Sequence, residues 1–366
     1  MPTNPRKNSS SETEKLKQTI TELPQYCVMF FMAKANTLAT NTRLGYAIDL
    51  KTFFWYLIST MPDRFPYPKI SDIPLETLNT LISDDIVMYL AYLEEYTMPD
   101  STGSYPTKTG PNGQPEIIVY HNSAQGKKRK LAALRTFFSY MMVNRKLSND
   151  PTVYVEIPKL HKKEVVTMTT KEENKFKNAV KIGKGKTKRG HKFFEKYKYR
   201  DYSIVLLFLE TGVRVSELCD MELFDLDLEE QRILVIRKGG NQQYVYFKKD
   251  TLSTLLSYLE LERPQLIKEG NDKKENGPLF ISNRGTKISI DRVEDIIKEY
   301  GRQVLPPNVK VSCHLLRKTC GSRIYEKTSD IALAQHVLGH SDPSTTSKYY
   351  INFNEERLKK LRDEDI

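Results

Sequence analysis

The chain has 366 residues, enough for two domains with a core each, and its 57 lysines and arginines against 46 acidic residues give a net charge of +11. Such an excess attracts polyanions, of which nucleic acid is the commonest, although an ordinary basic protein can carry it too. The composition suggests neither a zinc ribbon nor a disulfide framework, because no Cys-x2-Cys pair occurs among Cys27, Cys219, Cys313 and Cys320.

The N-terminal segment is polar. Residues 1–18 are rich in Ser, Thr, Asn, Lys and Glu and have little to bury, so we expect a disordered tail. Residues 1–14 lack the apolar stretch of a signal peptide, and the most apolar run of the chain, 202–209, is far too short to cross a bilayer. We therefore expect a soluble cytoplasmic protein without membrane contact.

The next part of the chain predicts a small helical domain over 19–150. Apolar residues recur at helical spacing around 44–58, around 86–93 after a candidate N-cap at Ser83, and around 131–141. Between the second and third helices, the segment 99–115 is crowded with Gly, Pro, Ser and Thr. This composition is typical of an inserted loop.

Two basic runs stand out. Lys127-Lys128-Arg129-Lys130 opens the third helix, and residues 181–200 hold nine lysines and arginines against one glutamate. Such runs are usually solvated surface, but in a basic protein contacts to nucleic-acid phosphates are a fair competitor. On that second interpretation we expect phosphate contacts from the first run and from Lys186, Lys188 and Arg189.

A linker is predicted at 151–165, where Pro151 and a second proline interrupt the helical pattern. The remaining residues, 166–366, mix helices with a few strands. The clearest β signal is a pair of β-rich runs, 232–236 and 243–247, joined by a Gly-Gly-Asn turn, which is typical of a hairpin. The sequence as a whole predicts a mainly α protein with a small β-sheet.

Two motif-like patterns fail on inspection. Gly185-Lys186-Thr187 resembles the end of a phosphate-binding P-loop, but the glycine required five positions earlier is Val180. His336 and His340 stand at i, i+4, but no third metal ligand is spaced beside them. We therefore expect neither a nucleotide nor a metal site.

Four segments, in chain order, carry the candidate chemistry. They are Thr211-Gly-Val-Arg-Val-Ser-Glu-Leu218, Arg237-Lys-Gly-Gly240, His314-Leu-Leu-Arg317 and Leu338-Gly-His-Ser-Asp-Pro-Ser-Thr-Thr-Ser-Lys-Tyr-Tyr350. Singly, each has a structural explanation: a surface arginine, a turn lysine, a solvated helix face, or one of 21 tyrosines. Together, in this order and spacing, they resemble the catalytic domain of the tyrosine recombinases, the phage integrase family, and most of all its Xer-type and transposon-integrase members.

The resemblance implies an N-terminal helical core-binding domain and a mixed α/β catalytic domain. It also implies a site-specific recombinase that cleaves and rejoins DNA through a 3′-phosphotyrosyl intermediate, without a cofactor. This sequence departs from the family at two places. Arg237 replaces the first glycine of the usual Gly-Lys-Gly turn, and Tyr349 is followed directly by Tyr350. The nine positions from His340 favour Tyr349 as the nucleophile, and Tyr350 stays a competitor.

Attack on a phosphodiester builds negative charge on phosphorus, so fixed cations and hydrogen-bond donors are the main need of such a site. Arg214 and Arg317 each offer a planar fork of N–H donors, and His340 adds another donor. Glu217 is expected to orient Arg214 or His340, or else to be an ordinary capping or salt-bridge carboxylate.

Two proton transfers are needed as well. The tyrosine must lose its proton, and His314 is the expected acceptor, although unassisted deprotonation in a cationic pocket stays open. The 5′-oxygen leaving group must gain a proton. Lys238, at the tip of the predicted hairpin, is the expected general acid, as in the family.

The expected partner is double-stranded DNA with an inverted-repeat core site, bound by two protomers and assembled into a homotetramer through a helical tail at 354–366. An accessory directionality factor would be compatible with this scheme. The insertions at 99–122 and 181–200 exceed a minimal Xer protein, so integration and excision of a mobile element is favoured over Xer-type resolution of chromosome or plasmid dimers. A type IB topoisomerase and a catalytically silent DNA-binding regulator are the rival classes.

Overall fold

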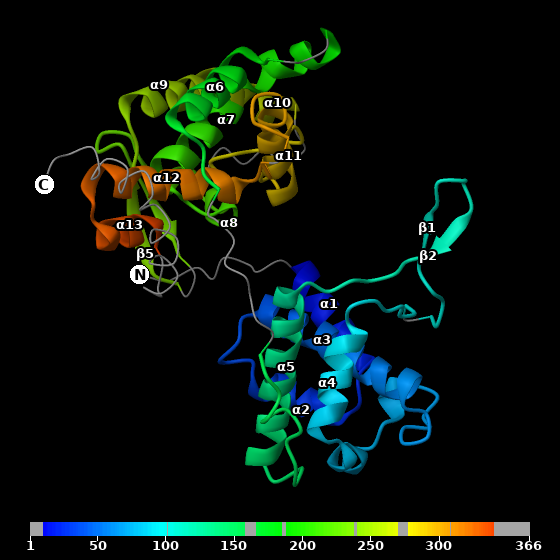
Figure 1. Cartoon of the computed structure of the whole chain (residues 1–366). Helices are drawn as coiled ribbons and strands as arrows, with labels where there is room; N and C mark the ends of the chain where they lie inside the picture. Colours follow the sequence, from blue (N-terminus) through cyan, green and yellow to red (C-terminus); the bar gives the residue numbers. More distant parts are fainter. Residues whose placement is uncertain are drawn as a thin grey trace, which may run out of the picture. The chain divides into compact units, whose positions relative to one another are not determined.

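In the computed structural model the chain forms two units, residues 1–162 and 163–366, the N-terminal and the C-terminal unit (Figure 1). The described residues are 10–100, 102–157, 166–184, 188–237, 240–269, 277–307 and 309–339. None of the described helices is long and apolar enough to cross a membrane. The architecture is mainly α-helical with small sheets, as the sequence predicted.

The N-terminal unit is built from helices around an aromatic core. Its helices are α1 (Ser10–Thr21), α2 (Tyr26–Ala33), α3 (Thr40–Thr60), α4 (Ser83–Tyr92) and α5 (Ala124–Val143), with short 3-10 turns at Ile70–Asp72 and Glu76–Thr80. Edge-on contacts of Phe53 with Phe138, and of Phe54 with Phe137, join α3 to α5 at the centre of this core. Aromatic pairs of this kind add to the stability gained from burying the rings.

Residues 10–18 correct the expected disordered tail, because they form most of α1. Leu16 is buried in the core of the N-terminal unit, and Ile20 packs against it. The polar composition therefore misled: one apolar residue per turn is enough to dock a short helix on a neighbouring helix, here α3. Residues 1–9 lie outside the described part of the chain.

The inserted segment after α4 contains a small hairpin of its own. Strands β1 (Thr107–Thr109) and β2 (Pro115–Ile117) pair antiparallel, with Thr107 opposite Ile117. Every strand residue is exposed, and the hairpin projects from the helices (Figure 1). It therefore adds little to the core.

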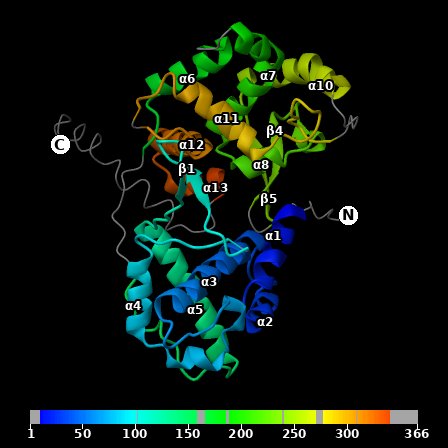
Figure 2. The same ribbon diagram turned by 90° about the vertical axis from the view of Figure 1, so that its right-hand side faces the viewer.

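The C-terminal unit packs around the second half of helix α7 (Lys188–Thr211), where residues 204–209 are buried, and α6 (Thr170–Ile182) and α11 (Ile290–Gly301) lie beside this helix (Figure 2). A three-stranded antiparallel sheet follows the order β3 (Leu226–Asp227), β4 (Arg232–Ile236), β5 (Gln242–Tyr246). Ile233 lies opposite Val245, and both are buried, so the predicted hairpin is confirmed.

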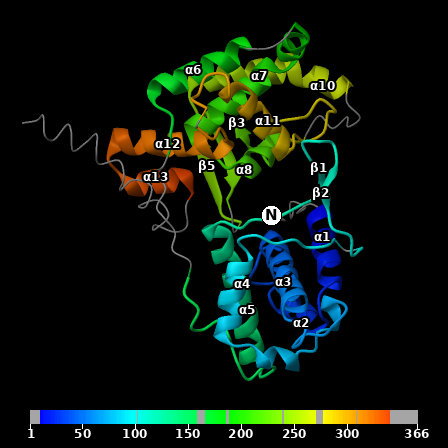
Figure 3. The ribbon, with the colours of Figure 1, turned by 45° about the vertical axis from the view of Figure 1, so that its right-hand side comes forward.

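The remaining elements complete the same core. They are α8 (Val215–Cys219), a 3-10 turn at Leu223–Asp225, α9 (Lys249–Ser257), a π-helical turn at Tyr258–Glu262, α10 (Arg263–Glu269), α12 (Cys313–Thr328) and α13 (Ile331–Leu338). Helix α12 packs on α7, and α13 lies beside α12 (Figure 3).

Candidate active site

The turn between α7 and α8 places Arg214 and Glu217. Arg214 is the N-cap residue of α8, and its backbone N–H donates to Glu217 Oε2 at 2.8 Å. Its guanidinium Nη1 donates to Glu217 Oε1 at 2.6 Å. Gly212, in the same turn, has φ +61°, and a Cβ there would lie 2.6 Å from a Leu338 methyl group. Only glycine allows both this turn and the close approach of α13.

Glu217 holds a second arginine, Arg237, which follows strand β4. Arg237 Nη1 donates to Glu217 Oε2 at 2.7 Å, and both side chains are buried. Its Nε donates to Gln243 Oε1 at 3.0 Å, and its Nη2 donates to the Val337 carbonyl at 2.8 Å. The sequence marked Arg237 only as the replacement of a glycine. Arg237 continues the alternation that buries Ile233 and Val235, but its partners Glu217 and Val337 lie 20 and 100 positions away, so the local sequence could not identify them.

Arg317, on α12, is the third guanidinium. It is buried, and it donates to the carbonyls of Gly212 and Leu338. Helix α13 ends at Gly339, which has φ +59°. A Cβ at Gly339 would lie 2.6 Å from Arg237 Nε, so this glycine is needed both for the turn and for the arginine beside it.

Side chains cap much of the last turn of α13. Four consecutive carbonyls, those of residues 336–339, each accept a hydrogen bond from a side chain, and the His336 carbonyl also accepts one from the backbone N–H of Gly339. The donors, in that order, are Gln243, Arg237, Arg317 and Arg214. The carbonyl end of a helix carries partial negative charge, which favours cations there.

The cluster carries more positive than negative charge: among the residues described around Glu217, three guanidiniums face one carboxylate. Burial alone would raise the pKa of Glu217, but the Arg214 N–H and the charge of Arg237 outweigh it and hold that pKa below its usual range. Burial, and then repulsion from Arg214, lowers the pKa of Arg317 to about 10. Such a cluster is suited to receive an anion with several oxygens, such as a phosphate.

His314 stands one turn before Arg317 on α12, and its side chain is exposed. Partial loss of solvent, and then the charges of Lys318, Arg317 and Arg214, lower the pKa of His314 below its ordinary value. The imidazole is therefore neutral near pH 7, the state in which it can accept a proton.

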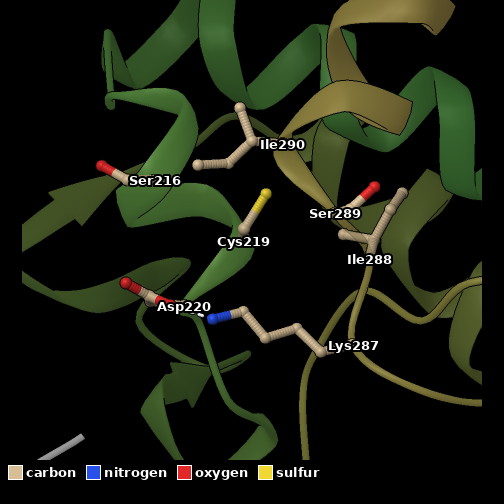
Figure 4. Close-up of a pocket in the computed structure, with 7 residues that line it drawn as sticks. All are labelled: Ser216, Cys219, Asp220, Lys287, Ile288, Ser289 and Ile290. Carbon is tan, nitrogen blue, oxygen red and sulfur yellow. Dashed lines mark hydrogen bonds and ion pairs between the residues drawn. The ribbon is translucent and has the colours of Figure 1, made fainter. Parts of the chain in front are cut away.

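On the other side of α8 lies a pocket of about 300 Å³ (Figure 4). Lys287 and Asp220 form an ion pair across it, and Cys219 points into it. Burial raises the pKa of the Cys219 thiol to about 12, so this cysteine stays protonated and unreactive. The residues that line this pocket are Ser216, Cys219, Asp220, Lys287, Ile288, Ser289 and Ile290. The Lys287–Asp220 pair fastens the segment before α11 to α8.

The structure thus brings Arg214, Glu217 and Arg317 together, adds Arg237, and places His314 on the same helix as Arg317. The other expected site residues lie outside the described part of the chain: Lys186, Lys238, His340, Tyr349 and the competitor Tyr350, together with the tail 354–366. The side chains of Lys188 and Arg189 are likewise not described. Within the described ranges, no group of three or more His, Cys, Asp or Glu side chains could hold a metal ion.

The basic run at the start of α5 divides into exposed and buried members. Lys128 and Arg129 are exposed. Lys130, which we expected to contact phosphate, is instead buried, and its Nζ donates to Asp49 at 3.0 Å and to Thr52 at 3.3 Å. An ammonium that is buried and bound in this way stabilises the folded helices, because exposing it would leave the Asp49 carboxylate with only Arg129.

Comparison with known proteins places this site in a family. The phage integrase family model matches residues 168–357. Tyrosine recombinase XerC from Caldanaerobacter subterraneus subsp. tengcongensis is 30% identical over 334 residues, which cover 89% of this chain and 82% of that protein. Tyrosine recombinase XerS from Streptococcus uberis is 27% identical over 372 residues, covering 95% of this chain and 97% of that protein.

The fold has a match among solved structures as well. XerH site-specific recombinase bound to palindromic difH substrate, in a post-cleavage complex, superimposes with a TM-score of 0.61 at 18% identity, covering 96% of this chain and 94% of that chain. The ordered motifs, the arginine cluster and these matches lead to one conclusion. The chain belongs to the phage integrase family, the tyrosine recombinases, which cleave and rejoin DNA.

Proposed function

We propose that this recombinase cleaves DNA at a specific core site by attack of Tyr349 on one phosphodiester, and rejoins it by the reverse step. The observation that carries the proposal is the cluster of the partly exposed Arg214 and the buried Arg237 and Arg317 around Glu217, the one carboxylate among the residues described there. Three cations with one counter-charge favour an added anion. In the tyrosine recombinases, this anion is a phosphate of the DNA backbone.

In this mechanism the Tyr349 oxygen bonds to phosphorus, and the bond from phosphorus to the 5′-oxygen breaks. Arg214 and Arg317 stabilise the charge on the non-bridging oxygens, with His340 as a further donor. His314 accepts the phenolic proton, and Lys238 gives a proton to the leaving 5′-oxygen. The phosphotyrosyl bond conserves the energy of the broken one, so rejoining needs no cofactor.

The two units correspond, in this proposal, to separate tasks. Residues 19–150 form the core-binding domain, 151–165 the linker, and 166–366 the catalytic domain with its C-terminal tail. The division of the chain after residue 162 and the start of the family match at 168 support this assignment. Phosphate contacts are assigned to Lys127, Lys128 and Arg129 of α5, and to Lys186, Lys188 and Arg189.

The proposed partner is DNA with an inverted-repeat core site, bound by a dimer and brought together in a tetramer. The palindromic substrate of the XerH complex supports the inverted repeat. The tail 354–366 is assigned the contact between protomers. A chain lacking 354–366 should still bind one core site but should fail in synapsis and strand exchange, which sedimentation and recombination assays measure. Unimpaired synapsis would contradict this part.

Two cellular roles fit the chemistry: integration and excision of a mobile element, and Xer-type resolution of DNA dimers. Chain length had favoured the first. Length does not separate the roles, however, because XerS aligns over 97% of its own length with 95% of this chain. The named relatives support the Xer-type role. Recombination between two directly repeated chromosomal sites, without an accessory factor, would support it further.

The decisive experiment uses a suicide DNA substrate, in which a nick beside the cleaved bond prevents rejoining. Wild type should form a covalent protein–DNA adduct, Tyr349→Phe should form none, and Tyr350→Phe should form it normally. Loss of the adduct only in Tyr350→Phe would move the nucleophile by one residue. Relaxation of supercoils without sequence dependence would instead indicate a topoisomerase.

A further inference from the structure

We propose that Arg237 is a positioning residue for Arg214: it shares the Glu217 carboxylate, and so keeps the Arg214 guanidinium available to the DNA phosphate. The inference rests on the proposed function of Arg214. It assigns to Arg237 a part in the reaction that its place in the sequence, before the expected general acid Lys238, does not announce.

The geometry is that of one carboxylate bridging two guanidiniums. Glu217 Oε1 accepts from Arg214 Nη1 at 2.6 Å, and Oε2 accepts from Arg237 Nη1 at 2.7 Å. Oε2 also accepts the backbone N–H of Arg214 at 2.8 Å. The carboxylate is thus held from both ends, and its orientation fixes where the Arg214 side chain lies.

The two arginines differ in exposure. The Arg214 side chain is 32% exposed, whereas that of Arg237 is only 5% exposed. Arg237 is therefore the permanent, internal counter-charge of Glu217, and Arg214 is the member that solvent or DNA can reach. Without Arg237, the buried charge of Glu217 would act on Arg214 alone and would compete with the phosphate for it.

Arg237 also holds the end of α13. Its Nη2 binds the Val337 carbonyl, and its Nε binds Gln243, whose amide in turn binds the His336 carbonyl. Arg214 binds the Gly339 carbonyl of the same turn. A single side chain therefore joins strand β4, helix α8 and helix α13 around Arg214. A lysine could neutralise Glu217 but could not make all three contacts, because it lacks the planar fork.

The test compares cleavage on three suicide substrates: an ordinary phosphodiester, a methylphosphonate, and a 5′-bridging phosphorothiolate. On the phosphodiester, Arg237→Met should be about 10²-fold slower than wild type, the size expected when a catalytic group is displaced. The methylphosphonate has lost the negative oxygen that Arg214 balances. On this substrate the variant should therefore lie within about fivefold of wild type, because little is left for Arg214 to stabilise. On the thiolate substrate, which needs no acid, the full defect should persist.

The matched control is Arg232→Met. Arg232 is the first residue of β4, at the opposite end of the strand from Arg237; it pairs with Asp227, and its Cζ lies 4.4 Å from the centroid of the Tyr244 ring. The Arg232→Met variant should cleave all three substrates at the wild-type rate. Arg237→Lys, which keeps a cation beside Glu217, should recover cleavage to within about tenfold of wild type. If Arg237→Met does not fold, this variant still gives the substrate comparison.

The outcomes separate the alternatives. Equal defects on all three substrates, or no defect at all, would overturn the inference. Recovery on the thiolate substrate would also overturn it, because Arg237 would then act through Lys238. If wild type forms no adduct, or if Tyr349→Phe still forms one, the proposed function itself fails rather than the role of Arg237.

Discussion

Each unit of this chain contains a buried carboxylate bound by two basic side chains, and the two clusters differ in how their charges are matched. In the N-terminal unit, Asp49 on α3 binds Arg129 at 2.6 Å and Lys130 at 3.0 Å. In the C-terminal unit, Glu217 binds Arg214 and Arg237, and Arg317 lies beside them and donates to the carbonyls of Gly212 and Leu338.

The difference separates an ion cluster that serves the core from one that can bind substrate. Burial raises the pKa of Asp49 and lowers the pKa of Lys130, and their mutual attraction opposes both changes. We call the Asp49 cluster closed, because Thr52 completes the contacts of the Lys130 ammonium. In the Glu217 cluster, which we call open, the surplus cations bind carbonyl oxygens instead. A phosphate oxygen accepts more strongly than a carbonyl, so it can compete for these donors.

The largest effect on cleavage is expected for Arg317→Gln. It removes a charged donor of the open cluster, and adduct formation on the suicide substrate should fall by about 10³-fold or more, since a single lost donor already costs 10² to 10³. Arg323→Gln is the matched control on the same helix, because Arg323 binds Glu173 and the Leu209 carbonyl. It should cost stability but leave the cleavage rate of folded protein unchanged. A similar loss of rate in both variants would contradict the distinction.

Substitutions in the closed cluster should lower the stability of the protein and leave the cleavage rate unchanged. Asp49→Ala leaves the buried Lys130 ammonium without its main partner, and should lower the free energy of unfolding by about 3–5 kcal/mol. Denaturant unfolding of the full chain measures this. The double variant Asp49→Leu with Lys130→Met should recover most of the loss, because it leaves no unpaired buried charge, and the Arg129 side chain is exposed to solvent. Cleavage per folded molecule should stay at the wild-type value. A stable Asp49→Ala variant with impaired cleavage would reverse the roles of the clusters.

His314 tests whether the open cluster also tunes a proton acceptor. Its pKa is lowered, so the neutral form persists to lower pH, and cleavage should begin to fall only below about pH 6.5, the ordinary histidine value. Lys318→Met removes a cation that lowers this pKa, so the acidic limb should move to higher pH. His314→Gln should slow cleavage by about 10²-fold and abolish the limb. A limb that survives in His314→Gln would favour unassisted deprotonation of the tyrosine.

The smallest effect concerns the basic run of α5. Lys128 is exposed, so Lys128→Ala should weaken DNA binding several-fold and reduce the slope of log affinity against log salt by about 1. Lys130→Met should leave that slope unchanged and lower the unfolding midpoint instead. Fluorescence anisotropy over a salt series measures both. An unchanged slope for Lys128→Ala would remove this run from the DNA-binding surface.

Much of the molecule followed from the sequence. The order and spacing of the four segments that begin at Thr211, Arg237, His314 and Leu338 indicated the family and its chemistry, because reaction at a phosphate demands particular side chains within a few positions of defined turns. The two β-rich runs joined by a Gly-Gly-Asn turn predicted the hairpin, and the pairing of β4 with β5 confirms it. Composition was a poorer guide at the N-terminus, where a few apolar contacts of α1 overrode its polar character.

The tertiary structure decided which basic residues are internal. Lys130 was expected to face DNA and is buried, whereas Arg237 was noticed only as a missing glycine and is part of the cluster around Glu217. Lys130 meets Asp49 across 81 positions, and Arg237 meets Val337 across 100. Both of these charges are buried where distant segments bring them a partner. Local sequence determines the residue's chemistry, while packing between remote elements determines whether that charge is used by the core or offered to a ligand.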